Sequence, residues 1–96
     1  MRILGVDPGY AIVGCGMVDC AGSSFRMVDY GAITTPAGMP MEERLAIIYT
    51  QLTTAIEKYR PQAMSIEQLY FTNNVTTAIA VAQARGVILL CAQQQR

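Results

Sequence analysis

Two acidic residues at the ends of predicted strands are the groups in this sequence best suited to bind a metal ion. Asp7 follows the apolar run 3–6, and Glu67 follows the run 63–66. Side chains alternate along a strand, so each acid lies on the face opposite to the large apolar residue before it. If the two strands are parallel neighbours, both carboxylates meet at one edge of the sheet. Divalent cations between them would relieve their repulsion, and oxygen ligands suit Mg²⁺ or Mn²⁺.

Each acid also has a simpler explanation. Asp7 begins the sequence Asp-Pro-Gly, where its side chain could serve only to cap a turn. Glu67, taken alone, would be a solvated strand end. For Asp7 taken by itself, the turn explanation is the better one. The presence of a second acid, Glu67, on the same face of its own strand favours metal binding instead.

The elements that must position these acids follow the order β-β-β-α-β-α. Strands are expected over 3–7, 12–18, 25–34 and 63–67, a turn over 20–24, and helices over 41–59 and from about 75 to 92. The first helix has apolar residues at three- and four-residue steps, acids in its first turn and Pro61 after its end. A right-handed crossover through this helix would set the fourth strand parallel to a member of the β-meander.

Gly14 and Gly16 lie on one face of the second predicted strand and leave a strip of bare backbone. Glycine within a strand usually marks a place where a ligand or another chain segment comes close. Packing against a helix and close approach by a DNA backbone explain the two glycines equally well.

Composition limits the possible classes of protein. The 96 residues suffice for one small domain, and a hydrophobic content of 52% can form a core. No signal peptide is apparent, and no apolar run is judged long enough to cross a membrane. Seven basic and seven acidic residues give no support for nucleic-acid binding. Three cysteines without a Cys-x-x-Cys pair, and no histidine, favour a cytoplasmic protein with free thiols and exclude a typical zinc site.

Four blocks of sequence carry a family resemblance. They are residues 5–9 (GVDPG), 14–16 (GCG), 66–68 (IEQ) and 83–87 (QARGV). Over essentially the whole chain, and with the spacing between blocks intact, the sequence resembles the RuvC family of bacterial Holliday-junction resolvases. A lone Gly-x-Asp-x-Gly is a weak signal, because several nucleotide-binding families carry one. The four blocks together are specific.

The resemblance implies an α/β fold of the ribonuclease-H-like class, with a β-meander followed by β-α units in a mixed five-stranded sheet. Residues 1–96 would form a partial nuclease domain. In the family, the fifth strand, two further carboxylates and the basic residues that hold DNA lie beyond position 96. The C-terminal part of the fold is therefore expected to be absent from this chain, which also explains its neutral charge.

The resemblance also implies a function. The family acts as a homodimer that cuts four-way junction DNA during recombination and repair, in the cytoplasm, alongside the branch-migration motor proteins RuvA and RuvB. Its chemistry uses four carboxylates and two Mg²⁺ ions, for which Mn²⁺ can substitute. Asp7 matches the first carboxylate and Glu67 the second, as catalytic and metal-binding residues. With two carboxylates of four, this chain is expected to be inactive alone.

Further residues are candidates for contact with DNA. Tyr70 matches an aromatic residue that wedges against a base at the junction centre, although a core or dimer contact is the alternative. Asn74 could contact a phosphate, but capping of the second helix explains it as well. Arg85 could contact DNA or form an ion pair, and a solvated or interface arginine is the simpler expectation. Gly14 and Gly16 complete this set.

Three other functions stay open. An actin-like ATPase or sugar kinase also opens with an Asp-Gly hairpin, but would carry a glycine-rich phosphate loop where this chain has aromatic residues. A ribonuclease-H-like nuclease that processes ribosomal RNA would share the fold, and the QARG block favours the resolvase instead. The chain could also be an inactive structural fragment.

Overall fold

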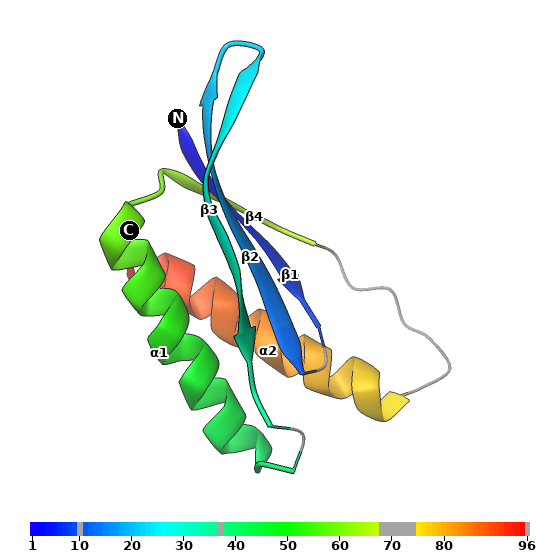
Figure 1. Ribbon diagram of the computed structural model, residues 1–96. Helices are drawn as coiled ribbons and strands as arrows, with labels where there is room; N and C mark the ends of the chain where they lie inside the picture. The colour runs from blue at the N-terminus through cyan, green and yellow to red at the C-terminus, as the bar shows by residue number, and fades with distance from the viewer. Residues whose placement is uncertain (10, 37, 68–74, 96) are drawn as a thin grey trace.

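The computed structural model describes residues 1–9, 11–36, 38–67 and 75–95. The elements follow the predicted β-β-β-α-β-α order (Figure 1). They are β1 (Arg2–Pro8), β2 (Ile12–Ala21), β3 (Ser24–Thr34), α1 (Met41–Tyr59), β4 (Ala63–Ile66) and α2 (Val75–Gln94).

The four strands form one mixed sheet in the order β3-β2-β1-β4. The β1–β2 and β2–β3 pairs are antiparallel, whereas β4 runs parallel to β1. Helix α1 makes the connection from β3 at one edge to β4 at the other, as the crossover argument predicted. Parallel pairing brings the C-terminal ends of β1 and β4 to the same edge of the sheet.

Both helices cover the same face of the sheet, and the hydrophobic core lies between these layers (Figure 1). Side chains from three strands and both helices meet there; the buried members are Leu4, Val6, Val13, Met17, Ile33, Ile48, Leu52, Ile56, Ala84, Ile88 and Cys91. We call the opposite side of the sheet the open face. On it, Met27 and Tyr30 of β3 are 56% and 79% exposed.

Helix α1 has the predicted bounds and ends in a left-handed C-cap at Arg60. Arg60 adopts the left-handed conformation (φ 50°), and its N–H donates to the Ile56 carbonyl at 2.8 Å, directly before Pro61. Its fourth residue, Arg44, is buried, and its Nε donates to the buried Thr35 hydroxyl at 3.0 Å. This polar contact ties the start of α1 to the end of β3, and the sequence pattern did not predict it.

The β2–β3 hairpin is longer than predicted. The expected second strand, 12–18, and the expected turn, 20–24, are both wrong in extent, because β2 continues to Ala21 and β3 starts at Ser24. Gly22 has φ 62°, a value that glycine adopts without strain, so two residues suffice for the turn. A register shift between Met17 and Val18 lets the two strands stay paired.

Helix α2 corrects one expectation from composition. Residues Thr76–Gln94 have the length and the mean hydropathy (1.3) of a membrane-crossing helix, although no such run was expected. Polar residues at 83 and 85 interrupt the run, but the many alanines and aliphatic residues keep its average high. One side of the helix, including Ala84 and Ile88, is buried in the core. We therefore assign α2 as a core helix of this fold.

Candidate metal and nucleic-acid site

Asp7 and Glu67 lie side by side at one edge of the sheet. The parallel register pairs Val6 of β1 with Ile66 of β4, and the next residue after each of them is an acid, Asp7 or Glu67. Glu67 lies one residue beyond β4, contrary to the predicted strand end, but its N–H still donates to the Val6 carbonyl at 3.2 Å. Both acids are exposed and line one pocket of about 270 Å³ on the open face. Their positions at one edge and on one face of the sheet are those predicted from the alternation of side chains.

Glycines keep the space beside Asp7 open. Gly14 is its cross-strand partner, and Gly16 is paired with Gly5 in the same way. A Cβ at Gly14 would lie 3.8 Å from the Asp7 Cβ, whereas a Cβ at Gly16 would have nothing within 4 Å. The three glycines on the open face, Gly5, Gly14 and Gly16, form what we call the glycine floor. None of the three glycines places a side chain on the sheet there.

The turn after Asp7 depends on another glycine. The Gly9 N–H donates to the Ile12 carbonyl at 2.9 Å, and a Cβ on Gly9 would lie only 2.5 Å from that oxygen. A side chain at this position would push the two strand ends apart. Gly9 therefore fixes the end of β1, where Asp7 lies.

Ser65 is a pocket residue that the sequence argument did not single out. It lines the pocket together with both acids, on the exposed side of β4, and its register partner is Gly5. A hydroxyl can donate to a carboxylate or accept from a water molecule. The alternation that places Ser65 and Glu67 on one face was the available signal.

The donor set of the pocket fits a hard divalent cation. Two carboxylates and a hydroxyl offer oxygen atoms only, which is the ligand type that Mg²⁺ and Mn²⁺ prefer. Over the ranges that the structure describes, no cluster of three or more His, Cys, Asp or Glu side chains is placed to hold a metal. Asp7 and Glu67 would thus hold an ion that completes its coordination with water or another oxygen donor.

Arg85 contacts the site from α2. Its Nε donates to the main-chain carbonyl of Glu67 at 3.2 Å, and the side chain is half-buried. A DNA contact, an ion pair, or a solvated or interface position was expected for this residue, and the observed partner is a backbone oxygen. A DNA contact by Arg85 stays a prediction. Tyr70 and Asn74 lie outside the described residues.

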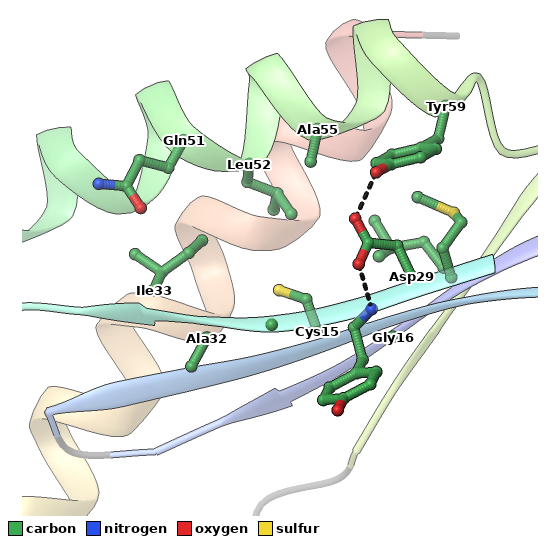
Figure 2. A pocket seen from close by; sticks show the side chains of 13 residues that line it. Cys15, Gly16, Asp29, Ala32, Ile33, Gln51, Leu52, Ala55 and Tyr59 are labelled. Carbon is green, nitrogen blue, oxygen red and sulfur yellow. Dashed lines mark hydrogen bonds between the residues drawn. The ribbon is translucent and has the colours of Figure 1, made fainter. Parts of the chain in front are cut away.

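A second pocket, of about 170 Å³, lies on the other side of the sheet between the strands and α1 (Figure 2). Its walls are mainly apolar. At one end, the Asp29 carboxylate accepts hydrogen bonds from the Tyr59 hydroxyl and, at 2.8 Å, from the Tyr30 N–H. The hydrogen bond from Tyr59 is the main reason why the pKa of Asp29 is lowered. The Cys15 thiol also lines this pocket, and burial raises its pKa. The Asp29 carboxylate already has two hydrogen-bond donors, and the raised pKa of Cys15 disfavours a reactive thiolate. Both groups are therefore suited to packing rather than catalysis.

Comparison with known proteins identifies the family of this chain. The model for "Crossover junction endodeoxyribonuclease RuvC" matches residues 3–96. The chain belongs to the RuvC family. The RuvC protein of Brevibacillus brevis is 56% identical over 93 residues, which cover 97% of this chain and 56% of that protein. The RuvC protein of Halothermothrix orenii is 51% identical over 96 residues, covering 100% and 58%. This chain thus spans less than two thirds of these RuvC relatives.

Solved structures give the fold. Thermus thermophilus RuvC in complex with a Holliday junction substrate matches with a TM-score of 0.91 and 26% identity, over 99% of this chain and 61% of that one. The ribonuclease-H-like fold predicted from the resemblance is therefore confirmed. An Aquifex aeolicus PPX-GPPA enzyme matches with a TM-score of 0.61 and 11% identity, a likeness that concerns the fold alone. The kinase, ATPase and ribosomal-RNA alternatives are not favoured by these RuvC relatives.

Proposed function

We propose that residues 1–96 form the N-terminal part of a nuclease domain that resolves four-way DNA junctions in recombination and repair. The observation that carries this proposal is the placement of Asp7 and Glu67 at the same end of two neighbouring parallel strands, in a chain of the RuvC family. The T. thermophilus relative in complex with a Holliday junction supports the choice of substrate.

In this proposal Asp7 and Glu67 hold Mg²⁺, with Mn²⁺ as a substitute, and are the catalytic residues of this part of the domain. When bound, paired ions of this type activate water and stabilise the leaving oxygen of a phosphodiester displacement. The glycine floor leaves room for a DNA backbone to approach Asp7. Tyr70 and Asn74 come three and seven residues after Glu67 in the sequence, and we assign them contacts with a base and a phosphate.

A homodimer is part of the same proposal. Helix α2 exposes Ile79, Leu89 and Leu90 at 54%, 42% and 51%, although Ala84 and Ile88 on its other side are buried. Large aliphatic side chains exposed on one helix favour contact with another protein surface. We assign this surface to a second copy of the chain. Cooperation with RuvA and RuvB, and a cytoplasmic location consistent with three free cysteines, complete the proposal.

A chimera tests this function. Residues 1–96 would be joined to the C-terminal remainder of the B. brevis RuvC protein, and the product incubated with a labelled four-way junction and Mg²⁺. We expect paired nicks on the junction and none on linear duplex. Asp7→Asn or Glu67→Gln should abolish the nicks and leave junction binding intact, because removing negative charge does not weaken attraction to phosphates. Full cleavage by a folded Asp7→Asn chimera would overturn the proposal.

A further inference from the structure

The main chain of Glu67 is held from two sides. Its N–H donates to the Val6 carbonyl of β1 at 3.2 Å, and its own carbonyl accepts from Arg85 Nε of α2 at 3.2 Å. The first bond joins Glu67 to the residue just before Asp7. The second joins it to a helix on the opposite side of the sheet from the acidic pocket.

The helix that supplies Arg85 is firmly placed. Ala84 directly before it is 4% exposed, and Ile88 one turn later is fully buried between α1 and the sheet. A guanidinium is planar and keeps its donors in a fixed geometry, so it can hold a carbonyl more precisely than a flexible amine. Because α2 is fixed in the core, the hydrogen bond from Arg85 also fixes the position of the Glu67 main chain at the end of β4.

We propose that Arg85 is a positioning residue that sets the Glu67 carboxylate relative to Asp7. The inference rests on the proposed role of these two acids as ion ligands. Residues that orient metal ligands are known to affect metal affinity strongly without touching the ion. This role uses the hydrogen bond from Arg85 to the Glu67 carbonyl and needs no contact with DNA.

Charge and position make opposite predictions for this residue, so the sign of the effect identifies its role. Arg85 carries a positive charge in contact with the main chain of Glu67, and a charge effect alone would oppose the binding of a cation. Removal of that charge would then tighten Mn²⁺ binding. Loss of the hydrogen bond would instead leave Glu67 less well placed, and Mn²⁺ binding would weaken.

The test is a titration of the ¹⁵N-labelled 96-residue chain with Mn²⁺, in which paramagnetic broadening of amide signals reports both affinity and location. In the wild-type chain, we expect broadening at Asp7, Gly14 and Glu67. Arg85→Met should weaken Mn²⁺ binding about tenfold while the rest of the spectrum is preserved. Lys58→Met removes the same charge from the last turn of α1, far from the pocket, and should leave Mn²⁺ affinity unchanged.

Unchanged or tighter binding by Arg85→Met would overturn the inference. If that variant does not fold, Arg85→Ala decides, because it removes every side-chain donor to the Glu67 carbonyl: weaker binding supports the positioning role, and wild-type or tighter binding rejects it. Broadening that is absent in the wild type, or unaffected by Asp7→Asn, would contradict the proposed metal site itself. The two failures are therefore distinguishable.

Discussion

Gly14 lies directly opposite Asp7 in the β1–β2 pairing, and the space that its missing side chain leaves belongs to the acidic pocket. A Cβ at Gly14 would come to 3.8 Å from the Asp7 Cβ, an ordinary contact distance. Alanine therefore fits this position, whereas a branched side chain would extend into the pocket. We therefore expect Gly14 to serve access to Asp7 rather than the conformation of the strand.

Gly14→Val should consequently reduce Mn²⁺ binding while the chain stays folded, because valine favours strand conformation. Gly16→Val is the matched control, since Gly16 does not line the acidic pocket and a Cβ there meets nothing within 4 Å. The Mn²⁺ titration separates the two variants. In the junction-cleaving chimera, both variants should reduce cleavage if a DNA backbone lies on the glycine floor. Normal Mn²⁺ binding by Gly14→Val would show that this glycine serves another purpose.

Ser65 allows an isosteric test of a hydroxyl in the acidic pocket. Ser65→Thr keeps the hydroxyl, whereas Ser65→Val has nearly the same shape as the threonine variant but no hydroxyl. If the hydroxyl donates to a carboxylate or to a bound water, Ser65→Val should weaken Mn²⁺ affinity about fivefold, the equivalent of one net hydrogen bond of about 1 kcal/mol. Ser65→Thr should bind as the wild type does. Equal affinities for the threonine and valine variants would remove Ser65 from the site.

Much of this arrangement could be predicted from sequence because it depends on periodicity. Alternation along two short strands was enough to put Asp7 and Glu67 on one face, and the apolar steps of residues 41–59 gave the bounds of α1. Breaker residues gave less precise information. The predicted turn over 20–24 was too long, because a single glycine with positive φ lets the strands stay paired up to Ala21.

Contacts between elements far apart in the sequence could not be predicted in this way. The bond from Arg85 to the Glu67 carbonyl depends on how α2 crosses the sheet, and nothing in the local pattern encodes that angle. Arg44 is buried although charged residues usually stay at the surface. Its hydrogen-bond partner Thr35 comes close only when α1 packs beside the end of β3, so the sequence pattern does not reveal the pair. The contacts of Arg85 and Arg44 both depend on how the helices pack against the sheet.

Asp19 should make the stability of the chain sensitive to acid. Arg2 donates two hydrogen bonds to this carboxylate, which is the main reason why its pKa falls to about 2, and Arg26 adds another. Because this value lies below the unfolded value of about 3.9, Asp19 stabilises the folded state above about pH 4. That contribution is lost as the pH falls from about 4 towards 2.

The measurement is chemical denaturation of the wild type and Asp19→Asn at pH 7, 4, 3 and 2. Asp19→Asn should be less stable than the wild type at pH 7, and the difference should shrink towards pH 2, where the wild-type carboxyl is protonated. Asp29 stays in both proteins, so its own lowered pKa affects both curves equally. A constant difference at every pH would exclude an ionic role for Asp19.

Gly31 offers a stabilising substitution at the second pocket. It lines the apolar pocket under α1, and a Cβ on this residue would have nothing within 4 Å. Alanine reduces the entropy of the unfolded chain, so Gly31→Ala should stabilise the protein by about 0.5–1 kcal/mol. Thermal unfolding measures the gain. A lower melting temperature would mean that the strand needs glycine at this position.

The 96-residue chain by itself should not cleave a four-way junction. Over the described ranges, the acidic pocket contains two carboxylates and no third Asp, Glu, His or Cys side chain, which is too few to fix two ions for in-line attack. Apolar side chains exposed on the open face and on α2 should also make the isolated chain associate. The assay incubates the purified chain with a labelled junction and either Mg²⁺ or Mn²⁺, beside the chimera as a positive control. Symmetric nicks by the chain alone, lost on Asp7→Asn, would show that two carboxylates are sufficient.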